Sequence, residues 1–275
     1  MKNHLKSLGL ALCMLPMFLH AGSGEDLKQT FQPVAPIPAG TILPVSLNTP
    51  LRSDRSGSGT AIIATVMQDV PLGRGETLRA GAQLTGHVIE TNTPGTGFDE
   101  AKISFQFDQV RFGDRTIPIT TSLRAVASRS AVFSATPELT SSENADYTIE
   151  IGGDQISYGE GGPVIAGSQV VGKYTRQGVL AYVDQDSGTP SGGTIDDNAR
   201  PQAFWLFSVN ASGAYGFGNM QITHSGSTDP LGEVTLASNS KAVKVGKGSA
   251  MLLRVDSSGL GEAHGGTTFS RGVGQ

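Results

Sequence analysis

The sequence predicts an all-β protein: a closed or nearly closed antiparallel β-barrel with a long Gly/Ser-rich insertion, preceded by a cleavable signal peptide. Three observations support this prediction. Glycine contributes 37 of the 275 residues and charged residues only 16%, which suits short strands and tight turns. Apolar and polar residues alternate at the period of a β-strand. A glycine corner leads into a strand three times, the last copy far along the chain from the other two.

The N-terminus has the layout of a secretory signal peptide. Lys2 and Lys6 precede an apolar stretch at 8–19, and small residues follow it. That stretch is shorter than the roughly 20 residues that a membrane-spanning helix needs, although an uncleaved anchor is the alternative. Cys13 is the only cysteine. We therefore expect an exported protein without disulfides, thiol ligands or cysteine nucleophiles.

The charge balance argues against two classes of partner. The formal net charge is −4, whereas nucleic-acid binding needs a basic face that neutralises phosphates. The chain also lacks the polybasic cluster that would hold an anionic membrane surface. We expect no nucleic acid and no membrane span in the mature chain.

Strand-like alternation is clearest near the middle of the expected barrel. Ile103, Phe105 and Phe107 fall on one face of a strand and polar residues on the other. Between about 129 and 230 the sequence is richer in Ser, Thr and Gly and less regular. The expected parts are a signal peptide at 1–21, a Pro-rich tether at 22–36, a barrel at 37–128 and 231–256, an insertion at 129–230 and a flexible tail at 257–275.

The repeated corners suggest how the barrel closes. Glycine permits the sharp bend and the positive φ that a larger residue resists, and a barrel removes unpaired edges by pairing its last strand with its first. We therefore expect 251–255 to lie against 42–47, although ordinary turn chemistry would also explain three similar corners. The corner glycines, including one at a hairpin turn, are Gly40, Gly81, Gly113 and Gly248.

The order of these motifs resembles the periplasmic barrel of TrbI-type subunits from type IV secretion and conjugation channels. After the first corner come Ser53-Asp54, Gly59 and a strand that ends in Asp69-Val70. The remaining motifs are LRAGAQLTGHV at 78–88, the hairpin ISFQFDQVRFGDRTIPIT at 103–120 and VKVGKGSAMLLRVD at 243–256. The resemblance covers roughly 36–128 and 231–256.

This resemblance implies a barrel that docks with other envelope proteins, rather than a catalyst. The family has amphipathic helices that cross the outer membrane, and the insertion here contains no such stretch. The family also has an uncleaved inner-membrane anchor, where this chain has an expected cleavable leader. Pore formation is therefore not part of the expectation.

The sequence contains only fragments of catalytic motifs. The segment 167–174 nearly matches the phosphate-binding loop motif. Tyr174, however, occupies the position of the Ser or Thr whose hydroxyl binds Mg²⁺ in that motif. Ser238 and Lys241 have the spacing of a serine–lysine pair, without the accompanying Lys-Thr-Gly element. We expect no catalytic residues, no cofactor and no enzymatic activity.

Two further groups leave alternatives open. A glycine-rich loop carries acids that could hold Ca²⁺ or could form a solvated acidic loop: Asp184, Asp186, Asp196 and Asp197. Phe204, Trp205 and Phe207 could offer a stacking platform for sugar, but their alternation onto both faces of a strand favours a buried core strand.

The leading hypothesis is a non-enzymatic, exported β-barrel protein that acts in envelope assembly or secretion through protein–protein contacts. Its partners would be envelope proteins or a second copy of the chain, contacted by the insertion and by a loop with Ser53, Asp54 and Gly59. The alternative is a soluble binding module for carbohydrate or another small ligand. The expected location is periplasmic, outer-membrane-associated or extracellular.

Overall fold

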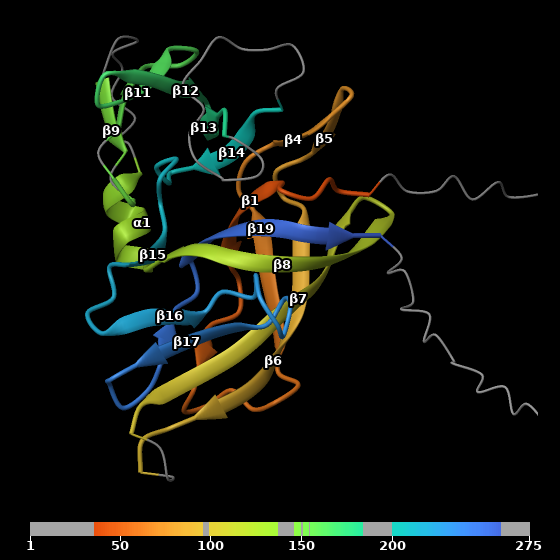
Figure 1. Ribbon diagram of the computed structural model, residues 1–275, viewed down its shortest axis with the longest axis vertical. Helices are drawn as coiled ribbons and strands as arrows, with labels where there is room; N and C mark the ends of the chain where they lie inside the picture. Colours follow the sequence, from red (N-terminus) through yellow and green to blue (C-terminus); the bar gives the residue numbers. More distant parts are fainter. Residues whose placement is uncertain are drawn as a thin grey trace, which may run out of the picture. The chain divides into compact units, whose positions relative to one another are not determined.

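Six antiparallel strands close into a β-barrel in the computed structural model (Figure 1), which describes residues 36–95, 99–136, 146–149, 151–153, 155–183 and 200–259. Around the barrel the order is β8, β19, β1, β3, β6 and β7, and β7 pairs with β8 to complete the ring. The predicted antiparallel barrel is thus confirmed. The bounds are β1 Ile42–Leu47, β3 Ala61–Val66, β6 Gln83–Asn92, β7 Ala101–Phe112, β8 Arg115–Ala127 and β19 Ala250–Ser258.

The last strand closes the barrel, as the sequence predicts. Strand β19 pairs with β1 in a register that runs from Ile42 opposite Arg254 to Ser46 opposite Ala250. On its other side β19 pairs with β8. The predicted signal peptide, nearly all of the tether and the tail beyond 259 lie outside the described residues.

Each predicted corner glycine has a positive φ: 79° at Gly40, 92° at Gly81, 55° at Gly113 and 83° at Gly248. An L-residue with a side chain pays a steric cost in this region, which glycine avoids. The structure adds one more corner at Gly59, where φ is 79°. Gly59 precedes β3, so the four strands β1, β3, β6 and β19 all follow a glycine corner of one kind.

These corners form two reciprocal pairs. Gly40 donates its amide to Val255 of β19, and Gly248, before β19, donates to Leu47 of β1, both at 2.8 Å. Strands β3 and β6 repeat this exchange, with donors Gly59 and Gly81 and acceptors Val88 and Val66, again at 2.8 Å. Each antiparallel pair is therefore tied at both ends by a glycine amide.

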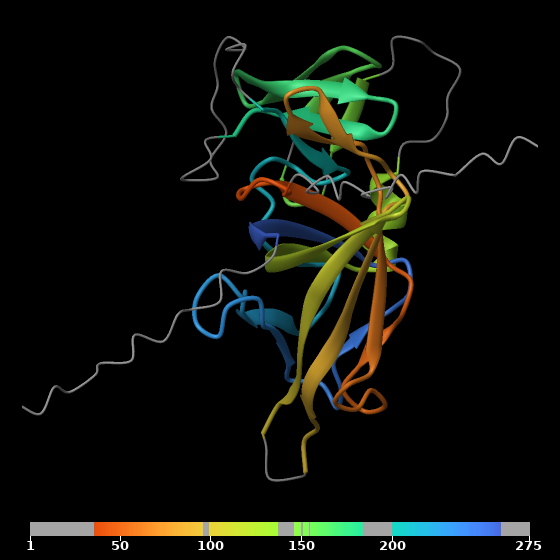
Figure 2. The same cartoon turned by 90° about the vertical axis from the view of Figure 1, so that its right-hand side faces the viewer.

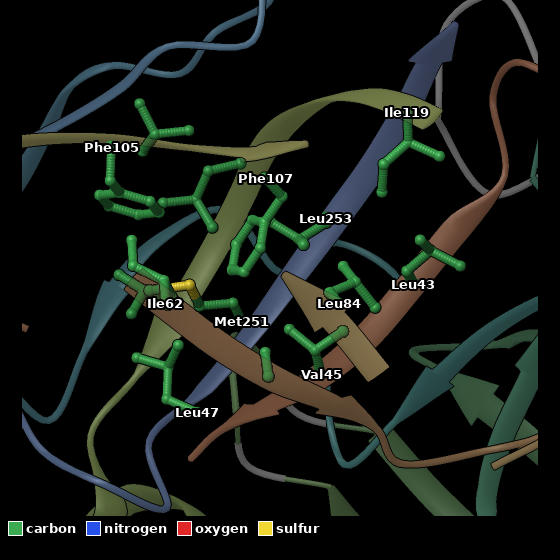
Figure 3. Packing of buried hydrophobic residues seen from close by; sticks show 14 of the residues in the cluster. Leu43, Val45, Leu47, Ile62, Leu84, Phe105, Phe107, Ile119, Met251 and Leu253 are labelled. Atoms are coloured by element: carbon green, nitrogen blue, oxygen red, sulfur yellow. The ribbon is translucent and has the colours of Figure 1, made fainter. Parts of the chain in front are cut away.

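Alternate side chains of the barrel strands fill its interior (Figure 3). Val45 of β1 and Met251 and Leu253 of β19 all point into the barrel interior. Phe105 and Phe107 of β7 pack edge to face, with ring centroids 6.0 Å apart. The barrel is a packed core, as expected for so few strands.

Shorter strands extend the barrel sheet. Strand β17 (Val234–Ser238) pairs with β7, β16 (Met220–His224) pairs with β17, and β15 (Gly213–Tyr215) runs parallel to β8. Two small pairs complete the described strands of this part: β2 (Leu51–Arg52) with β18 (Lys244–Val245), and β4 (Val70–Gly73) with β5 (Glu76–Leu78).

The insertion, which the sequence leaves largely irregular, contains a six-stranded antiparallel sheet. We call it the insert sheet. It runs in chain order through β9 (Asp146–Ile149), β10 (Gln155–Tyr158), β11 (Pro163–Ala166), β12 (Gln169–Thr175), β13 (Gly178–Ala181) and β14 (Gln202–Trp205). The described helix, α1 (Arg129–Ala135), precedes it and is capped at its N-terminus by Ser128, whose hydroxyl accepts the amide of Ala131.

The insert sheet packs against the outer face of β1, β8 and β19 (Figures 1 and 2). Small side chains at Ala125, Ala127 and Ala250 lie at this contact, together with Leu252. The strand β19 is therefore buried on both faces, which explains the continuous apolar run at 250–253.

Candidate functional site

The loop expected to contact partners is fixed from within by Ser53. This residue is buried, and its hydroxyl accepts the amide of Val243 at 3.0 Å. Its own amide donates to the carbonyl of Val243 at 3.1 Å. Ser53 therefore joins the loop to the chain before β18, while Asp54 and Gly59 remain exposed.

Asp54 is held by its neighbour Arg52. The guanidinium donates to both carboxylate oxygens, at 2.9 and 2.8 Å. These hydrogen bonds lower the pKa of Asp54 from its usual 3.8 to about 2. The ion pair lies at the surface, where such pairs contribute little to stability.

The calcium candidates Asp184, Asp186, Asp196 and Asp197 lie outside the described residues. Within the described ranges, no group of three or more His, Cys, Asp or Glu side chains could hold a metal ion. His87 bonds Asp108 through Nδ1 at 2.9 Å, and Gln106 donates to the same carboxylate at 2.9 Å. This is an exposed hydrogen-bonded group on a strand face.

The aromatic segment lies mainly in the core. Phe204 and Phe207 are fully buried, and the guanidinium carbon of Arg124 lies 5.6 Å from the centroid of the Phe204 ring. Trp205 is half-buried, with a φ of 52°. A flat aromatic face open to a sugar is not formed by Phe204 and Phe207.

The two fragmentary catalytic motifs occupy structural positions. Segment 167–174 forms a turn and most of β12, and Lys173 points to solvent. The hydroxyl of Ser238 accepts the amide of Ser240 at 3.1 Å, and Lys241 is exposed. A lysine that acts as a base normally needs a desolvated site, which lowers its pKa.

Exposed apolar side chains are concentrated in the insertion. The large apolar residues with at least a third of their surface exposed, within the described residues, are Ile63, Phe133, Ile156, Tyr158, Val170 and Leu231. Four of these six lie between 133 and 170, on α1 and the insert sheet. Single exposed apolar residues are common on protein surfaces, whereas a contiguous group indicates a binding surface.

The insert sheet presents such a group on its outer face. Ile156 of β10 lies opposite Ile165 of β11, which lies opposite Val170 of β12. Ile156 and Val170 are 43% and 55% exposed. With Tyr158, two positions along β10 and on the same face, these residues form what we call the apolar row.

Polar side chains of the same strand point the other way. Gln155 and Ser157 of β10 are almost fully buried. Neither side chain has a hydrogen-bond partner among the described residues. A sheet that faced only water would place these residues outward and Ile156 and Tyr158 inward, because burying unpaired polar groups is costly.

Hydrogen bonds hold the insert sheet on the barrel and thereby determine which face of the insert sheet is exposed. Gln202 of β14 accepts the amide of Ile42 at 2.9 Å. Gln68, which follows β3, accepts the amide of Trp205 at 2.7 Å. Because the inner face meets the barrel, the apolar row faces away from it.

The functional assignment of the chain rests on the geometry described above. No protein-family model, curated protein or solved structure matches the chain. Among the described residues, no helix has the length and apolar character required to cross a membrane. The sequence does not predict the apolar row, because its signal there is only the alternation in QISY at 155–158.

Proposed function

We propose that the protein is a non-enzymatic, exported component of the cell envelope that acts through protein–protein contacts. The contact surface is the apolar row of Ile156, Tyr158, Ile165 and Val170. The observation that supports it is the inverted β10 strand, with apolar side chains outward and unpaired polar side chains inward. An apolar surface of another envelope protein would bury the row and recover free energy of about 25 cal/mol per Å² of apolar area.

The barrel serves as the rigid support of this surface. Its strands are hydrogen-bonded to a neighbour on both sides all the way round, and its interior is filled. Binding residues on a rigid scaffold keep their positions without an entropic cost at each encounter. The resemblance to TrbI-type barrels covers the barrel and not the insert sheet, and it supports the proposal only in implying a barrel that works together with envelope partners.

Cell fractionation with site-specific crosslinking tests the proposal. A photoreactive residue at Val170 should crosslink to an envelope protein, whereas the same residue at Ile63, an exposed apolar position of β3, should not. Ile156→Lys should abolish the Val170 crosslink, because the row cannot bury an unpaired ammonium. Ile63→Lys is the matched control and should leave the crosslink intact.

Three results would overturn the proposal. The first is a protein retained in the cytoplasm. The second is a crosslink at Val170 that survives Ile156→Lys, since the captured protein would then not depend on the row. The third is a crosslink only to a second copy of the chain, which would replace an envelope partner with self-association.

A further inference from the structure

A second surface feature, separate from the apolar row, is a hollow beside the barrel with a volume of about 340 Å³. It lies where the loop before β16 faces the segment that joins β17 to β18. Its lining residues are Gly216, Phe217, Gly218, Asn219, Met220, Ser238, Ser240, Lys241, Ala242, Val243 and Lys244. None of these side chains is acidic, although the chain as a whole carries a net charge of −4.

The two lysines of the hollow have little compensating charge: among the described acids, Asp54 interacts electrostatically with Lys244. Neither Lys241 nor Lys244 forms an ion pair with any residue that the structure describes. In the β2–β18 pair, Lys244 lies directly opposite Arg52. Like charges at such positions destabilise a sheet unless an anion lies between them.

Asp54 neutralises this positive charge only in part. Asp54 gives both of its carboxylate oxygens to the guanidinium of Arg52, at 2.9 and 2.8 Å. The single negative charge of Asp54 therefore interacts with two cations, Arg52 and Lys244, and Lys241 adds a third positive charge. The rim of the hollow carries an excess of positive charge that a bound anion would compensate.

A buried hydroxyl supplies a directed donor. Ser238 is 6% exposed and lines the hollow. Its oxygen accepts the amide of Ser240 at 3.1 Å, and its O–H has no acceptor among the described residues. Because a hydroxyl can both accept and donate, this proton is free to bond an anionic oxygen.

The remaining wall is apolar. Phe217 and Met220 are half-buried and pack on the edge of the barrel core, and the buried Val243 also lines the hollow. A bare inorganic anion would leave this wall in contact with water. An anion that carries an apolar group would cover it and gain the corresponding hydrophobic free energy.

We infer that the hollow binds a small organic anion, a carboxylate or a phosphate ester with an apolar body. Its anionic head lies between the ammonium groups of Lys241 and Lys244 and accepts the hydroxyl of Ser238. Its apolar body lies against Phe217 and Met220. This site shares no residue with the apolar row, so either proposal can fail without the other.

Titration of the isotope-labelled full chain with phenyl phosphate and benzoate, followed by amide chemical shifts at constant ionic strength, tests this assignment. Shifts should be confined to 216–220 and 238–244. Inorganic phosphate should bind at least about tenfold more weakly, because it lacks the apolar body. Benzyl alcohol, which lacks the charge, should produce no saturable shift.

Three variants distinguish binding at the hollow from a nonspecific electrostatic effect. Lys241→Gln and Lys244→Gln should each weaken phenyl phosphate binding about tenfold, as expected for one charge-assisted hydrogen bond. Ser238→Ala, which keeps the charge, should also weaken it several-fold. Lys173→Gln, the same charge change on the insert sheet, should leave the affinity unaltered.

The inference is overturned if neither organic anion shifts these amides, or if Lys173→Gln weakens binding as much as Lys244→Gln does. It is also overturned if inorganic phosphate binds as tightly as phenyl phosphate. Each variant is first compared with the parent by its amide spectrum and thermal unfolding. A lysine variant that fails to fold is replaced by Lys241→Met or Lys244→Met, which also removes the charge and should weaken binding about tenfold.

Discussion

Gly248 donates its amide to the carbonyl of Leu47 at 2.8 Å, and the amide of Leu47 donates back across the same corner, to Ser249, at 2.9 Å. The start of the last strand is thereby fixed to the end of the first. More than 200 residues separate the two partners, so this corner helps to close the loop that contains most of the chain. The geometry of one glycine therefore bears on the stability of the whole barrel.

Replacing this glycine should destabilise the protein. Gly248→Ala should lower the free energy of unfolding by about 1–2 kcal/mol, because φ is 83° and the backbone is strained there, although an added Cβ would meet only the Arg129 side chain at 3.6 Å, an ordinary contact. Gly246→Ala, in the same turn, is the control: its φ is not in the left-handed region and the space around it is open. That variant should be neutral or stabilised by up to about 1 kcal/mol. Urea unfolding of both variants checks the prediction, and equal effects would contradict it.

Gly86 is required for another reason, because it allows the strands β6 and β7 to approach each other closely. A Cβ built at Gly86 would lie 2.0 Å from the carbonyl oxygen of Gln106 and 2.8 Å from Cα of Phe107. Backbone atoms cannot move aside as a flexible side chain can, so Gly86→Ala should cost about 3 kcal/mol or more. Gly57→Ala, in open space, should change the stability by less than about 1 kcal/mol. A Gly86→Ala variant with the parent's unfolding midpoint would show that the β6–β7 pair is looser than described.

Asp256 should make the protein less stable as the pH rises. Burial raises the pKa of Asp256, against the opposing effects of the Ser122 hydroxyl and of Arg254. One carboxylate oxygen, Oδ2, is buried without a hydrogen bond. A raised folded-state pKa means that the stabilising contribution is complete below the unfolded value and is lost as the pH rises through the folded value.

Asp256→Asn removes this titration. The variant should therefore unfold at a higher temperature than the parent near pH 7, and the difference should vanish toward pH 3. Thermal unfolding of both proteins across this range measures it. A variant that is less stable than the parent at pH 7 would mean that the ionised carboxylate has a partner that compensates its burial.

Asp69 should show the opposite pH dependence. Its pKa is lowered, because hydrogen bonds from the amide of Ala80 and the side chains of Arg79 and Gln177 outweigh the effect of burial. A lowered folded-state pKa gives stability that is present above the unfolded value and is lost as the pH falls. Asp69→Asn should therefore be less stable than the parent near pH 7, and the difference should shrink as the pH falls below the unfolded value of about 4 and through the lowered folded value. The same thermal series measures it, and a pH-independent difference would assign the loss to geometry instead of charge.

The sequence predicts the barrel because its signals are local. A glycine corner followed by alternating apolar residues marks a strand wherever it occurs, and the copy at 246–256 therefore identifies the closing strand. The sequence does not distinguish the corner at Gly59, because Ser and Thr surround it as in any polar loop. The sequence assigns Ser53 to the partner contacts from its loop alone, because Val243, whose amide the Ser53 hydroxyl accepts, lies 190 positions away.

The insert sheet could not be predicted in the same way. Its strands are mostly four residues long, and four residues are too few to establish a period. In β10 the alternation is visible, but it does not reveal which face is covered. That depends on the contact with the barrel, which involves Gln68 and Gln202 and leaves no pattern in the sequence.

Gln68 connects the barrel to β14, the strand that carries the single tryptophan. Gln68 is 1% exposed, and its Oε1 accepts the amide of Trp205 at 2.7 Å. Gln68→Ala would leave that amide without its acceptor, at a cost of about 1–3 kcal/mol. Because Trp205 has a φ of 52°, which is unfavourable for a bulky residue, losing this bond should also release the local backbone.

The expected result of Gln68→Ala is a lower unfolding midpoint together with a red shift of the tryptophan emission, since the half-buried indole would become more exposed to water. Gln83→Ala, at an exposed position of β6, is the matched control and should change neither quantity. If Gln68→Ala lowers the midpoint without moving the emission, the bond stabilises the barrel alone. The insert sheet would then be held on the barrel by its apolar contact and by Gln202, and the orientation of the apolar row would not depend on Gln68.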